Sequence, residues 1–263
     1  MNRFWPQVIS PILEAARPDA VLEVGAAAGT HTRRLLKFCC PRGITLYVID
    51  PEPRFEPAEL AEDADGFVFH RGRSLDVLPD LGPVDVALID GDHNWYTVTG
   101  ELQLLQRTAR SAGRMMPLVL CHDVCWPYGR RDLYYDPDAI PAEHRQPWER
   151  AGIVFGESAL VPDRGLNAEL ANAKHEGGPR NGVMTAIEDF VEASTEPLEV
   201  TVLPDLHGLG IVAPASRLEA GTGLRKAIAH WRTAKGRADL APLVERERLR
   251  LLVANDELRR QLS

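Results

Sequence analysis

The chain has 263 residues, of which 44% are hydrophobic and 26% charged, and 38 acidic against 30 basic side chains give a net charge of −8. This length and apolar content suit one large domain or two small ones with a substantial core. The acidic balance argues against nucleic acid as a partner, because proteins that follow a phosphate backbone need a basic face. No apolar run approaches the roughly 20 residues that span a bilayer, so we expect no membrane partner. The first residues (MNRFWPQVIS) lack a signal peptide's apolar centre, which predicts a cytoplasmic protein.

Short β-rich runs alternate with helical stretches from residue 21 to residue 123. This alternation is typical of an α/β fold, in which helices cover both faces of a parallel sheet. The run 84–92 (VDVALIDGD) is almost continuously apolar before its acidic end, as expected for a strand buried on both faces. The predicted strands are 21–25, 44–50, 66–72, 84–92 and 115–123, and the predicted helices are 6–16, 30–38, 74–80 and 94–108.

The regular pattern stops after residue 123 and returns near residue 181. The stretch between is rich in Pro, Tyr, Trp, Arg and Gly, which is typical of a functional lid or binding loop. A helix is predicted at 181–194. Two β-like runs, 198–204 and 208–214, follow with a connection short enough for an antiparallel hairpin. We therefore expect a domain over 1–215, in which 124–180 is an insertion that forms a lid and binds the substrate.

The remaining residues, 216–263, are predicted to form a charged helical extension. Val244, Leu251 and Leu258 repeat every seven residues along it, although Arg248 and Asn255 interrupt the stripe. Such a stripe packs either on a partner or on the helix's own domain. Together with the predicted helix 6–16, it suggests a homo-oligomer formed through the terminal helices.

A short glycine-containing turn, Glu23-Val24-Gly25-Ala26-Ala27-Ala28-Gly29, joins the first predicted strand to the next helix. Glycine lets the backbone turn sharply and approach a ligand closely, and a helix N-terminus offers free N–H groups. Ala27 stands where the dinucleotide pattern G-x-G-x-x-G has its second glycine, which argues against a nicotinamide oxidoreductase. Asp50, at the end of the second strand, can accept the ribose hydroxyls of an adenosine group.

With this turn and Asp50, the sequence resembles the class I S-adenosylmethionine-dependent methyltransferases. The resemblance covers about residues 18–123 and 180–215 and implies a Rossmann-like, seven-stranded sheet with a final antiparallel hairpin. It also implies S-adenosylmethionine as the cofactor. By resemblance, the methionine part would lie along the turn, Glu23 would hold its amino group, Asp50 the ribose, and Arg73 with Ser74 the adenine. The cofactor-binding residues expected in this way are Glu23, Gly25, Ala26, Ala27, Gly29, Asp50, Arg73, Ser74 and Asp90.

Polar side chains also end the fourth and fifth predicted strands, as Asp90-Gly91-Asp92-His93 and His122-Asp123. The carboxyl ends of central strands form the ligand crevice of open α/β sheets, so these groups should converge. Converging carboxylates repel one another unless a cation or hydrogen-bond donors compensate them. A Mg²⁺-like ion would resolve the repulsion and acidify a bound substrate hydroxyl. His93 is the candidate general base, because imidazole titrates near neutral pH.

This arrangement resembles the metal-assisted small-molecule O-methyltransferases, particularly the sugar O-methyltransferases of macrolide biosynthesis of the macrocin and mycinamicin type. The resemblance implies that Asp90, His122 and Asp123 hold a divalent metal, Mg or Mn, and that His93 is the catalytic base. His122 stands where the family usually has an acid, which shifts the metal preference from Mg²⁺ toward Mn²⁺, Fe²⁺ or Zn²⁺. The alternative for His122 is a buried, hydrogen-bonded histidine with no metal role.

The sequence therefore predicts an S-adenosylmethionine-dependent O-methyltransferase whose acceptor is a small-molecule hydroxyl, on a sugar or polyketide-type metabolite of natural product biosynthesis. Two alternatives stay open, a metal-independent methyltransferase that uses His93 alone and a non-catalytic cofactor-binding or scaffold protein. Side chains of the insertion should line the acceptor pocket. The residues expected there are Tyr128, Arg130, Arg131, Tyr134 and Tyr135.

Overall fold

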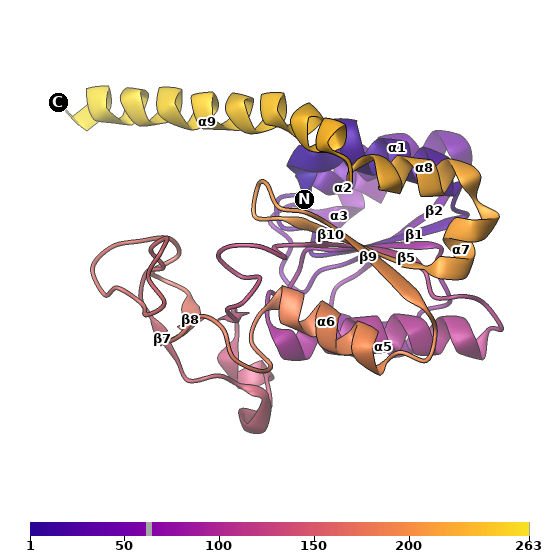
Figure 1. Ribbon diagram of the computed structural model, residues 1–263, viewed down its shortest axis with the longest axis horizontal. Helices are drawn as coiled ribbons and strands as arrows, with labels where there is room; N and C mark the ends of the chain where they lie inside the picture. Colours follow the sequence, from indigo (N-terminus) through magenta and orange to yellow (C-terminus); the bar gives the residue numbers. More distant parts are fainter. Residues whose placement is uncertain (62–64, 263) are drawn as a thin grey trace.

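The computed structural model describes residues 1–61 and 65–262, and its centre is a seven-stranded sheet with the order β3-β2-β1-β4-β5-β10-β9 (Figure 1). Strands β1 to β5 run parallel, and β10 pairs antiparallel with β5 on one side and with β9 on the other. The predicted α/β sheet with a final antiparallel hairpin is thus confirmed. Its strands are Ala20–Val24 (β1), Thr45–Ile49 (β2), Phe67–His70 (β3), Val86–Ile89 (β4), Leu118–His122 (β5), Leu198–Leu203 (β9) and Leu209–Pro214 (β10).

The register of the central strands brings the predicted site residues to one edge of the sheet. Val24, the last residue of β1, pairs with Ile49 of β2 on one side and with Ile89 of β4 on the other. Ile89 in turn pairs with Cys121 of β5. The order of strands reverses between β1 and β4, and such a switch point opens a crevice at the carboxyl ends of the strands.

Helices cover both faces of the sheet, and each face has its own apolar core (Figure 1). One core joins α1, α2 and α8 to the sheet, and the other joins α5 and α6 to it. Leu102 and Leu105 of α5 and Phe190 of α6 are buried in the second core. The helices are Ser10–Ala16 (α1), Thr30–Cys39 (α2), Pro57–Ala61 (α3), Ser74–Val77 (α4), Trp95–Ser111 (α5), Val183–Ala193 (α6), Ala215–Ala220 (α7), Thr222–His230 (α8) and Ala234–Leu262 (α9).

Several predicted elements differ from the observed ones at their ends. The fourth strand stops at Ile89, because the chain leaves the sheet at the polar Asp90-Gly91-Asp92 sequence. The predicted helix 6–16 is regular only from Ser10, and Trp5–Ile9 forms a π-helix. Pro11 has no N–H to donate to the residue 7 carbonyl, which explains why the first turns are irregular.

The insertion is ordered around a second, small sheet that the sequence did not predict. Its strands are Leu133–Tyr134 (β6), Trp148–Arg150 (β7) and Ala171–Ala173 (β8), in the antiparallel order β6-β8-β7. The insertion lies beside the carboxyl edge of the main sheet (Figure 1). Strands of two or three residues are too short to give a period in the sequence.

The C-terminal residues pack on the domain at first and then leave it. Leu224 and Ile228 of α8 are buried in the same core as α1, and so is Leu240 at the start of α9. The outer part of α9 projects away from the body (Figure 1), where its leucines at 249, 251, 252 and 258 are about half or more exposed. None of the helices in the described part of the chain combines the length and apolar character that crossing a membrane needs.

Candidate active site

The turn after β1 lies directly against the end of β4. Gly25 has φ +87°, and a Cβ atom at this position would lie 2.3 Å from the carbonyl oxygen of Asp90. Only glycine adopts this conformation freely and leaves room for so close an approach. Gly29, with φ +71°, ends the turn as the N-cap residue of α2. The two glycines of the sequence pattern are therefore both required by the backbone.

Asp50 holds this turn in shape from the end of β2. Its Oδ2 atom accepts the N–H groups of Ala26 at 2.8 Å and of Ala27 at 2.9 Å, and its Oδ1 atom accepts that of Glu52 at 2.8 Å. The side chain is buried. The carboxylate thus organises the turn. Ribose hydroxyls would have to donate to the lone pairs on its two oxygens that these three N–H groups leave free.

Glu23 points to the face of the sheet covered by α1 and α2, where it meets His31. The Nδ1 atom of His31 lies 2.9 Å from Oε1 of Glu23, and both side chains are buried. The second oxygen of Glu23 and Nε2 of His31 are also buried, without a hydrogen-bond partner among the described residues. The edge of the Trp5 ring packs on His31, with 5.5 Å between ring centroids. His31 is not among the site residues that the sequence predicted.

The residues expected to contact adenine have protein partners. Arg73 forms an exposed ion pair with Asp136 of the insertion at 2.5 Å. The Ser74 hydroxyl donates to Oε1 of Glu101 at 2.5 Å, and both side chains are buried. Burial raises the pKa of the Glu101 carboxyl to about 8, although the Ser74 hydroxyl opposes the shift. A protonated carboxyl therefore lies beneath this part of the crevice at neutral pH.

The ends of β4 and β5 bring together Asp90, His122 and Asp123. The Nδ1 atom of His122 lies 3.1 Å from Oδ1 of Asp90 and 2.7 Å from Oδ2 of Asp123. Burial alone would lower the pKa of His122, but the two carboxylates raise it to about 9. Burial also opposes ionisation of Asp90, yet His122 and the Met1 ammonium group, 2.8 Å away, hold its pKa below the usual range.

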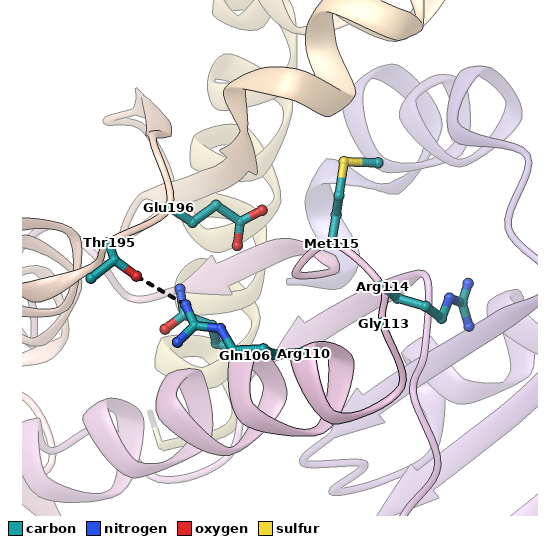
Figure 2. A pocket seen from close by; sticks show the side chains of 7 residues that line it. All are labelled: Gln106, Arg110, Gly113, Arg114, Met115, Thr195 and Glu196. Atoms are coloured by element: carbon teal, nitrogen blue, oxygen red, sulfur yellow. Dashed lines mark hydrogen bonds between the residues drawn. The ribbon is translucent and has the colours of Figure 1, made fainter.

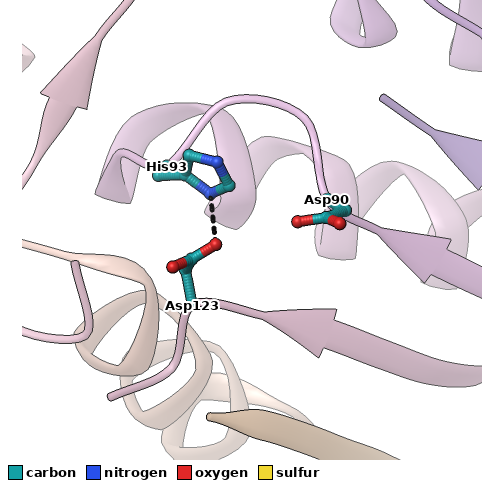
Figure 3. A group of neighbouring side chains, drawn as sticks. All are labelled: Asp90, His93 and Asp123. Carbon is teal, nitrogen blue, oxygen red and sulfur yellow. Dashed lines mark ion pairs between the residues drawn. The ribbon is translucent and has the colours of Figure 1, made fainter. Parts of the chain in front are cut away.

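His93 faces the same cluster from the loop before α5 (Figure 3). Its Nδ1 atom lies 3.6 Å from Oδ2 of Asp123. The imidazole is buried and stacks on the Tyr128 ring with 5.7 Å between centroids and 7° between planes. The Tyr135 ring lies 6.1 Å from it at 57°. Two aromatic rings of the insertion therefore fix the orientation of His93.

The three side chains in Figure 3 have the chemistry of a metal site. Asp90, His93 and Asp123 each offer one ligand atom, and these atoms all lie within 4.8 Å of one another. Two carboxylates and an imidazole suit Mn²⁺ and related divalent ions. The sequence predicted His122 in this set, with His93 as the base. In the structure, both histidines contact the carboxylates, and the assignment of ligands stays a prediction.

Two of the residues expected to line the acceptor pocket do not face it. Arg131 is fully buried and donates to the backbone carbonyls of Ala173 and Ser158. Tyr134 is also buried, and its hydroxyl donates to Asp132. Arg130 forms a paired contact with Glu188 of α6. These expectations were wrong for Arg131 and Tyr134, because both side chains build the core of the insertion.

A separate cavity of about 380 Å³ lies between the C-terminal end of α5 and the segment before β9 (Figure 2). Arg110 donates to the Thr195 hydroxyl at its edge. Met115 and its neighbours precede β5, so the cavity belongs to the opposite edge of the sheet from His93. It does not contribute to the candidate active site.

Comparison with solved structures finds distant similarity. PaMTH1, an SAH-bound methyltransferase from Podospora anserina, is 15% identical, with a TM-score of 0.47 over 78% of this chain and 76% of that one. A Corynebacterium glutamicum protein is 14% identical, with a TM-score of 0.45 over 78% and 79%. A candidate O-methyltransferase from Klebsiella pneumoniae is 14% identical, with a TM-score of 0.44 over 81% and 79%. No curated protein is significantly similar in sequence.

Residues 22–124 match a protein family described as "Methyltransferase domain". This segment contains β1 to β5, the glycine turn, Asp50 and the polar ends of β4 and β5. The seven strands and the antiparallel hairpin are those that the resemblance to class I enzymes implies. Residues 22–124 are therefore similar in sequence to methyltransferase domains, and the observed sheet agrees with the class I fold that the sequence predicted.

Proposed function

We propose that the protein transfers a methyl group to a hydroxyl of a small molecule, a sugar or polyketide-type metabolite of natural product biosynthesis, in the cytoplasm. The observation that carries the proposal is the convergence of Asp90, His93 and Asp123, whose ligand atoms lie within 4.8 Å of one another beside the glycine turn. An imidazole next to carboxylates can take a proton from a hydroxyl, which is the step that O-methylation requires.

The chemistry of the Glu23–His31 pair fits the methionine part of the cofactor. If Nδ1 of His31 donates to Glu23, the two partnerless buried atoms, Oε2 of Glu23 and Nε2 of His31, are both acceptors. An ammonium group is the donor that two neighbouring acceptors favour. S-adenosylmethionine, when bound, would supply the electrophilic methyl group. The chain's own contribution is to orient it with the glycine turn that Asp50 holds in place.

His93 would act as the base through Nε2. Its Nδ1 atom faces Asp123 at 3.6 Å, so a proton on Nδ1 is directed to the carboxylate and Nε2 is left as the acceptor. Tyr128 stacks on the ring and limits its rotation. Asp123 would also stabilise the imidazolium that forms when His93 takes the proton.

A divalent cation would be held by Asp90 and Asp123, with His122 or His93 as the imidazole ligand. When bound, it would lower the pKa of the acceptor hydroxyl. The two carboxylates supply the negative charge that such an ion requires. If His93 is a ligand, the same side chain cannot serve as the base through the same nitrogen.

A metal-independent reaction is the second candidate, and one contact favours it. His122 already lies within hydrogen-bond distance of both carboxylates, at 3.1 and 2.7 Å. A protonated His122 would offset the negative charge of the Asp90 and Asp123 carboxylates, which a metal ion would otherwise offset. His93 would then deprotonate the acceptor alone.

Two measurements test the proposal. Isothermal titration with S-adenosylmethionine and S-adenosylhomocysteine should show binding, and absence of binding of both at millimolar concentration would exclude the cofactor. Methyl transfer from labelled S-adenosylmethionine to a panel of glycosylated and polyketide hydroxyl acceptors tests the reaction. Activity that EDTA removes and Mn²⁺ or Mg²⁺ restores supports the metal-assisted form, whereas equal rates in chelator and metal support the second candidate.

A further inference from the structure

The insertion contacts the loop that carries His93 through one buried carboxylate, that of Asp132. Its Oδ1 atom accepts the N–H of Trp95 at 2.8 Å and the N–H of Gly182 at 2.6 Å. Its Oδ2 atom accepts the hydroxyl of Tyr134 at 2.7 Å. Trp95 is the first residue of α5 and Gly182 is the N-cap of α6. One carboxylate therefore joins the N-terminal ends of two helices, where negative charge is most stabilising.

The neighbouring backbone adds a second contact to the same loop. The N–H of Leu133 donates to the carbonyl of His93 at 3.0 Å. Residues 132 and 133 thus bind the chain immediately on both sides of Asn94, at the His93 carbonyl and at the Trp95 amide. On the other side, the N–H of Asp132 donates to Oδ1 of Asn181 at 2.7 Å, which ties this segment to the start of α6.

Capping of α5 alone does not require Asp132. Asn94, the N-cap residue, accepts the N–H of Thr97 at 2.8 Å. The Trp95 amide could be solvated at little cost, as the first amides of helices commonly are. Burying a carboxylate is expensive by comparison, and burial raises the pKa of Asp132 to about 6 even though the Gly182 and Trp95 amides and the Tyr134 hydroxyl favour its charged form.

We infer that Asp132 is a positioning residue: by fixing the Trp95 amide, it holds the His93 imidazole on Tyr128 and opposite Asp123. The inference rests on the proposed role of His93 as the base. It assigns the insertion a part in catalysis besides binding the acceptor. Tyr128 stacks on the His93 ring, and Asp132 fixes the backbone beside His93. These two residues are four positions apart, so one segment of the insertion makes both contacts.

Amide hydrogen exchange in the full chain tests the contact. In the wild type, the Trp95 amide should be protected although it is the first of its helix. Asp132→Ala should speed its exchange at least about tenfold, since the amide loses the carboxylate that accepts its hydrogen bond. Asp132→Asn retains an acceptor oxygen and should restore protection. Thr97, whose partner is Asn94, should exchange equally in all three proteins, and it serves as the internal control.

The position of His93 is read from its imidazole signals in a ¹H–¹³C spectrum of histidine-labelled protein, assigned with His93→Gln. We expect Asp132→Ala to shift or broaden the His93 signal and Asp132→Asn to return it toward the wild-type position. Tyr134→Phe is the matched control, because it removes a hydrogen bond from the same carboxylate but not the one to Trp95. An unchanged His93 signal in Asp132→Ala, or an equal change in Tyr134→Phe, would overturn the inference.

These readouts are independent of the proposed function. If the wild type fails to bind S-adenosylmethionine, the proposed function fails while the exchange and imidazole signals still test Asp132. If the cofactor binds and turnover is found, Asp132→Ala should lower kcat about tenfold or more, with the KM and Kd for S-adenosylmethionine within about threefold of the wild type. If Asp132→Ala does not fold, Asp132→Ser takes its place in both measurements. Rapid exchange of the Trp95 amide in the wild type would by itself overturn the inference.

Discussion

The Nδ1 atom of His93, on the loop after β4, faces the Oδ2 atom of Asp123, at the end of β5, at a distance of 3.6 Å (Figure 3). Neither residue is near the other in the sequence. The parallel pairing of β4 with β5 places both at one edge of the sheet. This pair decides the first prediction, because the carboxylate can direct the proton of the imidazole.

Replacing His93 by Gln should lower methyl transfer by about 10²- to 10⁴-fold, the usual contribution of a general base. Asp123→Asn should act in the same direction, because the amide no longer stabilises the imidazolium. The Kd for S-adenosylmethionine, measured by calorimetry, should change little in His93→Gln. His230→Gln is the matched control on α8, far along the chain from the crevice. Wild-type turnover in His93→Gln would show that another group takes the proton.

Gly25→Ala should destabilise the protein and weaken cofactor binding together. The added Cβ would lie 2.3 Å from the Asp90 carbonyl oxygen, so backbone must move, at a cost of more than about 3 kcal/mol. Gly43→Ala is the control that separates the cost of a positive φ from the cost of a steric clash. Gly43 also has positive φ, but a Cβ there meets nothing within 4 Å. It should cost only about 1 kcal/mol. Equal losses in urea unfolding of the two variants would contradict this account.

Glu101→Gln should change how stability depends on pH. The pKa of Glu101 is raised to about 8, while an unfolded Glu titrates near 4.3. Between these values the folded state keeps a proton that the unfolded state has released. The contribution of Glu101 to wild-type stability should therefore fall by about 1.4 kcal/mol per pH unit, and this loss should level off above about pH 8.

The Gln variant has no such titration, so its free energy of unfolding relative to the wild type should increase steadily from about pH 5 to about pH 8. Urea unfolding followed by tryptophan fluorescence at several pH values measures this difference. Glu219→Gln, on the exposed surface of α7, should follow the wild type at every pH. A constant difference between Glu101→Gln and the wild type would mean that Glu101 is ionised in the folded protein.

The outer part of α9 should associate with a second copy of the chain. Leu251 and Leu258 are about 60% exposed on a helix segment that contacts little else of the body, and an isolated segment of this length is marginal in water. Leu251→Glu combined with Leu258→Glu should weaken self-association at least about tenfold. Arg246→Glu changes the charge of the same helix in the same direction and should not. Analytical ultracentrifugation that finds only monomer for the wild type would contradict the prediction.

The convergence of the site could be predicted from the sequence because it depends on strand ends. A parallel strand needs only an apolar run with a polar stop, and Asp50, Asp90 and Asp123 each mark such a stop. The glycine turn could also be recognised in the sequence. Gly25 and Gly29 both adopt positive φ, a conformation that glycine adopts most readily, so the turn leaves a visible glycine pattern. These features are local, and the sheet then brings them together without further information.

The parts that the sequence did not reveal depend on contacts between distant residues. The strands of the insertion are two or three residues long and carry no period. Asp132 reads as an ordinary polar residue beside Arg131, and its partner Trp95 lies 37 residues earlier. The pairing of Glu23 with His31 needs the helix after the turn to fold back over β1. Aromatic and basic composition therefore suggested ligand contacts for Arg131 and Tyr134, which are core residues.

The insertion is anchored near its start, where Asp132 binds Trp95, and Asn181, the residue after its end, binds the same segment. The stretch between β6 and β8 carries none of the hydrogen bonds to the His93 loop described above. Under the predicted role of the insertion in binding the acceptor, exchanging that stretch for a loop of different shape should alter substrate choice. A chimaera that grafts only residues 136–170, and leaves 128–135 and 171–182 native, should inherit an intact base and a new acceptor preference.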